Sequence, residues 1–99
     1  KAKDIRVLDV RKISNITDYM IVASGTSTRH TSAMADKVLD RMREHMIHSL
    51  GMEGRDTGAW VLLDYGDVIL HLMVPATREF YGLEKLWGEN EKNKVIKKK

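Results

Sequence analysis

The sequence predicts an α+β fold, with a mixed β-sheet that carries helices mainly on one face. Two observations support this. Two strand-like runs precede a segment with helical spacing, and two further strand-like runs flank a turn before a second helical segment. The chain has 99 residues, the size of one domain. We therefore expect a single domain over residues 1–88 and a Lys-rich tail over residues 89–99.

The first two strands are predicted before a break in the hydrophobic pattern. Residues 4–11 alternate between two faces, and residues 18–24 form a short apolar run typical of a central strand. Gly25 interrupts that run. The hydroxyl of Thr26 or Ser27 can then accept a hydrogen bond from an unpaired N–H at a helix start.

A long helix is predicted next, from about residue 28 to the mid-forties. Met34, Val38 and Met42 fall on one stripe at helical spacing. Gly51 is the first clear stop signal, and residues 52–59 are interpreted as a loop.

Residues 60–74 are predicted to form a β-hairpin. A two-residue turn at Tyr65-Gly66 would pair Trp60 with His71. One face is then wholly aliphatic and must be core: Val61, Leu63, Val68, Leu70, Leu72 and Val74. The other face is mixed: Trp60, Leu62, Asp64, Asp67, Ile69, His71 and Met73. Since a slip of one residue would mix the two faces, their separation supports the pairing.

One more helix is predicted after the hairpin. Pro75 suits the first turn of a helix, and Gly88 is placed to end it. Phe80, Leu83 and Trp87 share one stripe between them. The complete prediction is a four-stranded sheet backed by helices on its aliphatic face.

The charge distribution limits the choice of partners. Five lysines and two glutamates in residues 88–99 account for the whole net charge of +3, so the body is neutral. A neutral body argues against direct nucleic-acid binding as the main function, while the tail could supply a non-specific electrostatic contact. The absence of cysteine excludes a disulfide scaffold and a cysteine nucleophile, and no apolar run is long enough to cross a bilayer.

The mixed hairpin face is the first candidate site. Trp60 lies among apolar and acidic side chains there, and tryptophan is frequent at interface hot spots. The face is either a partner-binding surface or a face covered by a helix, in which case Trp60 is core. Both interpretations remain open at the level of sequence.

Two chemical alternatives have weaker support. Asp64 and Asp67, joined by Asp9 or Asp18, could hold Mg²⁺, with Gly25-Thr26-Ser27 cradling a phosphate. That loop lacks a Walker lysine, and acidic residues at a hairpin tip usually stabilise the turn. His45 and His48, with Glu44 nearby, do not form a known metal motif and are more simply solvated. We therefore expect no catalytic residue, no metal and no cofactor.

Several spaced segments together resemble the ribosomal silencing factor (Iojap) family. They are Asp4–Arg11, Thr17–Met20, Ser24–His30, Trp60–Val68, His71 and Tyr81–Trp87, and the resemblance covers nearly all of residues 3–88. It implies a nucleotidyltransferase-like α+β fold without a known transferase activity. It also implies binding to the large ribosomal subunit through its protein L-fourteen, which obstructs joining of the small subunit and lowers translation. Relatives in organelles are linked to ribosome assembly.

The resemblance assigns candidate docking residues. Partner docking is carried over to Trp60, Asp64, Tyr65, Asp67 and His71, with Lys85 and Trp87 as further candidates. The function expected is that of a cytoplasmic, non-enzymatic translation repressor. The alternatives are a ribosome assembly factor that uses the same site and a nucleotide-handling enzyme of the same fold. The resemblance also allows a homodimer and a peripheral contact with ribosomal RNA, and no membrane partner is expected.

Overall fold

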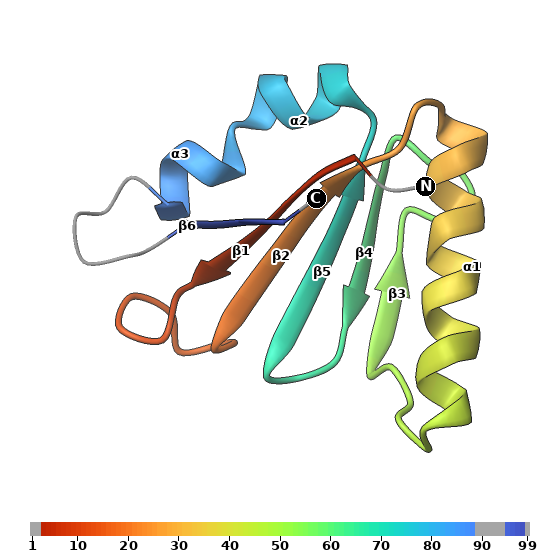
Figure 1. Cartoon of the computed structure of the whole chain (residues 1–99), viewed down its shortest axis with the longest axis horizontal. Helices are drawn as coiled ribbons and strands as arrows, with labels where there is room; N and C mark the ends of the chain where they lie inside the picture. Colours follow the sequence, from red (N-terminus) through yellow and green to blue (C-terminus); the bar gives the residue numbers. More distant parts are fainter. Residues whose placement is uncertain (1–2, 89–94, 99) are drawn as a thin grey trace.

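One six-stranded sheet, in the order β3-β4-β5-β2-β1-β6, organises the computed structural model (Figure 1). The structure describes residues 3–88 and 95–98, and for 86–88 and 95–98 only the backbone. The elements are β1 Lys3–Asp9, β2 Tyr19–Ser24, α1 Thr28–Glu44, β3 Gly51–Glu53, β4 Trp60–Asp64, β5 Val68–Met73, α2 Pro75–Tyr81, α3 Leu83–Gly88 and β6 Val95–Lys98. β2 and β5 pair in parallel and the other neighbours antiparallel, which confirms the predicted mixed sheet.

The prediction of four strands is wrong, because it did not include the two edge strands β3 and β6. β3 lies where a loop was expected, and its three residues are all exposed, so they show no alternation of burial. Backbone pairing defines this strand, including a hydrogen bond of 2.6 Å from Leu50 N–H to Asp64 O just before it. β6 lies in the Lys-rich tail and pairs with β1, with Ile96 opposite Val7.

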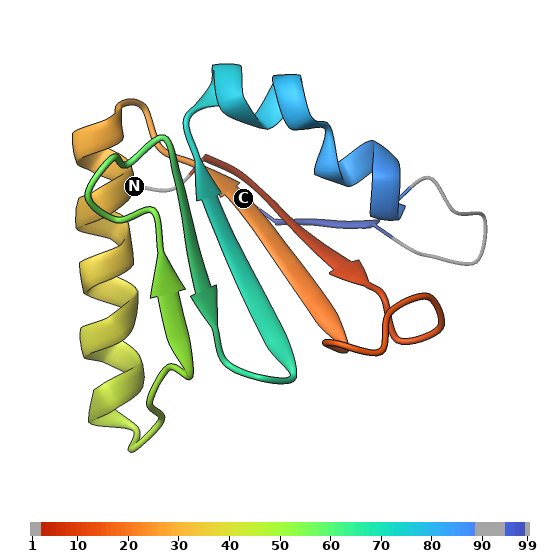
Figure 2. The same ribbon diagram turned by 180° about the vertical axis from the view of Figure 1, so that it is seen from behind.

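Helices cover both faces of the sheet, which corrects the prediction that they pack mainly on one face. On one face, Met34, Val38 and Leu39 of α1 pack on a cluster formed by Ala23, Ala35, Val61, Leu63 and Leu72. On the other face, Leu83 of α3 packs on a second cluster formed by Leu8, Val10, Met20, Val22 and Met73. Seen from behind, α2 and α3 lie over a different part of the sheet from α1 (Figure 2).

The β4–β5 hairpin keeps its predicted faces but has a different register. Trp60 pairs with Met73, and Leu62 pairs with His71. The turn is therefore Gly66-Asp67 rather than Tyr65-Gly66, closed by a hydrogen bond of 2.9 Å from Tyr65 N–H to Val68 O. Gly66 has φ of 83°, a left-handed conformation that glycine adopts without strain. Because the register moves by two residues, every side chain stays on its predicted face.

The segment predicted as one helix after Pro75 is broken in two. Gly82 ends α2 in a left-handed conformation with φ of 57°, and α3 begins at Leu83. The break separates Phe80 from Leu83, so Phe80 is 80% exposed instead of sharing a buried stripe. The predicted stripe residue Trp87 lies where only the backbone is described.

The long helix begins and ends close to the prediction. Ser27 caps α1, since its Oγ accepts a hydrogen bond of 3.1 Å from His30 N–H. Among the helices that the structure describes, none is long and apolar enough to span a membrane.

Candidate docking surface

Trp60 and His71 form a polar link at the centre of the mixed hairpin face. The indole Nε1–H of half-buried Trp60 donates to Nδ1 of His71 at 3.0 Å, so the imidazole proton sits on Nε2. His71 is 4% exposed, and its burial lowers the pKa to about 4. The imidazole is therefore neutral at pH 7, as an acceptor for the indole must be.

An aromatic group extends from Trp60 across α2. The Tyr81 ring lies 4.7 Å from the Trp60 ring, and the Phe80 ring meets Tyr81 edge-on at 5.0 Å. Phe80 is 80% exposed and Tyr81 is 54% exposed. Trp60 and Leu62 also line a cavity of about 340 Å³ with Glu53 and Gly54. We call Trp60, Leu62, Phe80 and Tyr81 the aromatic surface. Large exposed aromatic side chains in contact with each other are typical of a protein-binding site.

Part of the mixed face is core rather than surface. Ile69, His71 and Met73 are 8%, 4% and 0% exposed, because β2 and the α2–α3 side of the molecule enclose them. His71 therefore supports Trp60 through their hydrogen bond and exposes almost no surface of its own, and its predicted role in docking stays a prediction. The interpretation of Trp60 as core holds in part, since its ring packs on the buried cluster. The ring also borders the exposed Tyr81, and partner binding by Trp60 stays a prediction.

The two aspartates predicted for docking lie at the hairpin turn, away from Tyr81. Oδ1 of Asp64 accepts a hydrogen bond of 2.8 Å from Gly66 N–H, which stabilises the turn. Asp67 is exposed, and its backbone carbonyl accepts hydrogen bonds of 3.0 Å from the N–H groups of Asp18 and Tyr19. Asp64 is four residues from Trp60 along β4, about 13 Å in a strand. These acids can extend the aromatic surface only as a distant rim.

Tyr65 lies on the opposite face from Trp60. Its side chain packs against the α1-side cluster, where burial raises the pKa of the phenol. The phenol oxygen is buried and has no hydrogen-bond partner among the described residues. Tyr65 therefore cannot share a flat interface with Trp60. Lys85 is exposed on α3, and the Trp87 side chain lies outside the described residues.

The residues that suggested nucleotide chemistry do not come together. Gly25-Thr26-Ser27 follows the carboxyl end of β2, whereas Asp18 and Asp67 lie at its amino end. Thr26 N–H donates to His30 Nδ1 at 2.9 Å, and Ser27 caps α1, so both take part in local structure. In residues 3–88 and 95–98, no three His, Asp or Glu side chains are arranged to hold a metal ion.

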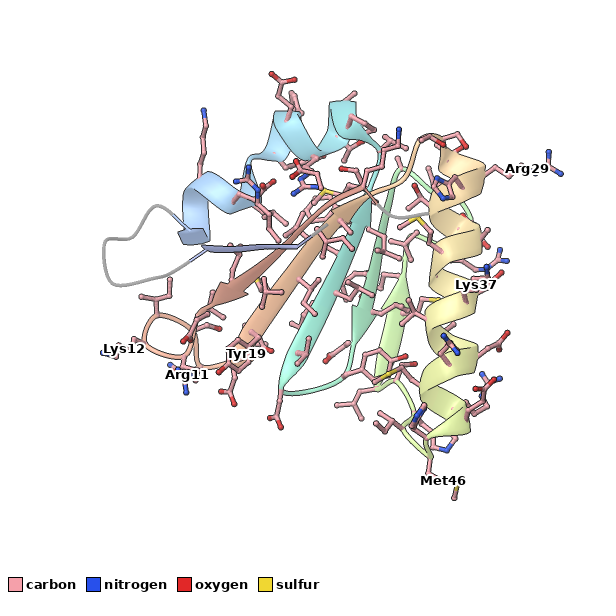
Figure 3. The ribbon with its side chains drawn as sticks, in the orientation of Figure 1. Arg11, Lys12, Tyr19, Arg29, Lys37 and Met46 are labelled. Carbon is pink, nitrogen blue, oxygen red and sulfur yellow. The ribbon has the colours of Figure 1, made fainter. Side chains whose placement is uncertain are left out.

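A cavity of about 520 Å³ lies on the α1 face of the sheet. Its apolar lining includes Ile5, Ile21, Met34, Val38 and Leu70, and Lys37 of α1, labelled in Figure 3, also lines it. His30 also lines it, with Nδ1 bonded to Thr26. Most of this wall is apolar and provides packing area, with His30 and Lys37 as its titratable side chains.

Sequence reasoning missed Arg78 and Glu84, and it placed Phe80 on one helical stripe with Leu83 and Trp87. Arg78 is only 7% exposed, and it donates two hydrogen bonds to Glu84, of 2.7 and 3.0 Å. An arginine on a short helix is expected to be solvated, so no signal in the sequence marks this one as buried. The buried ion pair emerges only from the packing of α2 and α3 on the sheet.

These features define an α+β domain with a mixed sheet, helices on both faces and an aromatic surface suited to binding a protein. The family model described as "Ribosomal silencing factor during starvation" matches residues 1–99. A ribosomal silencing factor of Chromobacterium violaceum is 44% identical over 88 residues, covering 89% of this chain and 72% of the relative. One from Bacillus subtilis is 40% identical over 89 residues, covering 90% and 75%.

A solved structure agrees with the sequence relationship. A Chromobacterium violaceum protein superimposes with a TM-score of 0.86 at 44% identity, over 89% of this chain and 73% of that one. The chain belongs to the ribosomal silencing factor family.

Proposed function

We propose that the chain is a cytoplasmic translation repressor that binds the large ribosomal subunit through its protein L-fourteen. The observation that carries the proposal is the contact of half-buried Trp60 with the exposed rings of Tyr81 and Phe80. Such a surface gains free energy when a partner covers it. The neutral body favours a ribosomal protein over bare RNA as the first contact.

Repression by this route needs no chemical step. A domain that occupies an intersubunit surface excludes the small subunit by steric overlap, provided that it dissociates slowly. Slow dissociation comes from a few well-packed aromatic anchors rather than from rim charges. The aromatic surface provides such anchors, and the hydrogen bond to His71 fixes the orientation of Trp60.

A second function is favoured by one relative. A mouse protein named "Mitochondrial assembly of ribosomal large subunit protein 1" is 42% identical over 89 residues, covering 87% of this chain and 39% of that protein. An assembly factor could use the same surface but would act on immature particles. Finding this chain mainly on precursor particles in a gradient, rather than on mature large subunits, would favour assembly. A homodimer and a peripheral RNA contact stay predictions.

The test is co-sedimentation with purified large subunits, together with capture by isolated protein L-fourteen. Trp60→Ala and Tyr81→Ala should each weaken binding by about 2 kcal/mol, about 30-fold in Kd. Tyr19→Ala is the matched control, because Tyr19 lies at the far end of the sheet beside Arg11 (Figure 3). Circular dichroism checks that each variant is folded. Folded Trp60→Ala that binds like the wild type would exclude this surface as the docking site.

A further inference from the structure

The helix α2 is held in place by a charged residue. Of its seven residues, only Arg78 is buried. A helix this short is not stable alone in water, and α2 presents no apolar stripe to the sheet. Its position must therefore come mainly from the contacts of Arg78.

The guanidinium of Arg78 joins three elements. Its Nε and Nη2 donate to the two carboxylate oxygens of Glu84 on α3, at 2.7 and 3.0 Å. Its Nη1 donates to the Oγ of Ser24, at the end of β2, at 2.8 Å. The guanidinium of Arg78, which bonds like a two-pronged fork, therefore connects the two sides of the break at Gly82. It fixes both short helices, α2 and α3, to the central part of the sheet.

Two further charged side chains lie next to the pair of Arg78 and Glu84. Arg6 of β1 approaches Glu84 at 3.3 Å, and a carboxylate oxygen of Asp4 lies 3.8 Å from Arg78. Asp4 itself has φ of 51°, at an irregularity in the pairing of β1 with β2. Two cations and two anions balance, so the buried guanidinium is paired, as a stable buried charge must be.

We propose that Arg78 is a positioning residue whose bidentate pair with Glu84 holds α2 so that Phe80 and Tyr81 join Trp60 in the aromatic surface. Tyr81 follows Arg78 by three residues, so it lies about one helical turn away along α2. If the fork is lost, the helix pivots at Gly82 and the contact of Tyr81 with Trp60 is populated only part of the time. The consequence for docking rests on the proposed function.

Arg78→Lys and Glu84→Gln test this inference. Lysine keeps the charge but cannot form the planar fork, and glutamine keeps the size but loses the charge. Both variants should lose the NMR cross-peaks between the Tyr81 ring and the Trp60 indole, while the amide signals of β4 and β5 stay in place. If α2 is then correctly placed one tenth of the time, Kd for large subunits rises about tenfold.

The matched control is Arg11→Lys. Arg11 makes a similar bidentate pair with Asp9, with distances of 3.0 and 2.7 Å, but far from α2. It should change neither the cross-peaks nor Kd. If Arg78→Lys unfolds the chain, Glu84→Gln provides the same test.

The outcomes separate this inference from the proposed function. Tyr81→Ala that weakens binding, with Arg78→Lys and Glu84→Gln that keep both the ring contact and the affinity, would overturn the inference alone. Loss of the ring contact without any change in Kd would overturn its link to docking. If neither Trp60→Ala nor Tyr81→Ala alters binding, this surface is excluded as the docking site and the link to docking fails, while the contact between the Tyr81 and Trp60 rings still tests whether Arg78 positions α2.

Discussion

Trp60 donates its indole N–H to His71 at 3.0 Å, and this bond requires a neutral imidazole. Burial lowers the pKa of His71 from an ordinary value of 6.5 to about 4. The hydrogen bond between Trp60 and His71 therefore makes the aromatic surface depend on the protonation state of the buried His71 imidazole. This connection makes the stability of the domain sensitive to mild acid.

Stability should fall as the pH decreases from about 6.5 to about 4. The unfolded chain binds a proton at His71 first, so unfolding is favoured in this range and stability rises with pH through it. The full effect is about 3 kcal/mol, and it is complete near pH 4, where folded and unfolded forms are both protonated. Urea unfolding at pH 7 and pH 4.5 measures it.

His71→Gln is the control for this pH dependence. Glutamine can still accept the indole hydrogen bond but does not titrate. The pKa values of Asp9 and Asp36 are lowered by Arg11 and Arg55. Titration of these two carboxylates therefore changes the stability of the domain mainly below the ordinary carboxyl pKa of 3.8. A His71→Gln variant with the same loss of stability between pH 6.5 and 4 would contradict the assignment.

Trp60→Phe should destabilise the domain by about 1–2 kcal/mol beyond the effect of the smaller ring, because it removes the donor to buried His71. Chemical denaturation measures the change. Tyr81→Phe is the matched variant, since it removes a polar atom from a side chain that is 54% exposed. It should alter stability by no more than about 0.5 kcal/mol. Equal effects of the two variants would show that the indole bond contributes nothing.

Gly82→Ala should lower the melting temperature. Gly82 has φ of 57°, and an alanine there costs about 1 kcal/mol, or about 4–8 °C in a domain of this size. Gly51→Ala is the control, because its added Cβ meets nothing within 4 Å. That change should be neutral or stabilising, since it restricts the unfolded chain. Differential scanning calorimetry compares the two, and equal melting temperatures would contradict the strain at Gly82.

The turn at Gly66 shows which features of the β4–β5 hairpin can be predicted from the sequence. Alternation along β4 and β5 predicted which side chains share a face, because that depends only on a period of two. It could not choose between turns at Tyr65-Gly66 and Gly66-Asp67, because both contain the same glycine. The bond from Gly66 N–H to Asp64 stabilises the observed turn.

The aromatic surface was only partly predictable for a related reason. Trp60 was found because its face is mixed, but the apolar spacing of Phe80 and Leu83 continued straight through Gly82 and hid the break in the helix. The break itself occurs at Gly82, while the position of α2 depends on the contacts of Arg78 with Glu84 and Ser24, residues that are distant or unremarkable in sequence. Tertiary contacts of this kind override local periodicity.

Tyr65→Phe should leave docking unchanged and should be neutral or stabilising by about 1 kcal/mol, because the Tyr65 hydroxyl is buried without a partner among the described residues. The variant separates the two faces of the hairpin: Tyr65 packs beside α1, whereas Trp60 contacts Tyr81. Denaturant unfolding and large-subunit co-sedimentation measure the two effects, with Trp60→Ala as the variant expected to lose binding. A clear loss of subunit binding by folded Tyr65→Phe would move the docking surface to the α1 side of the sheet.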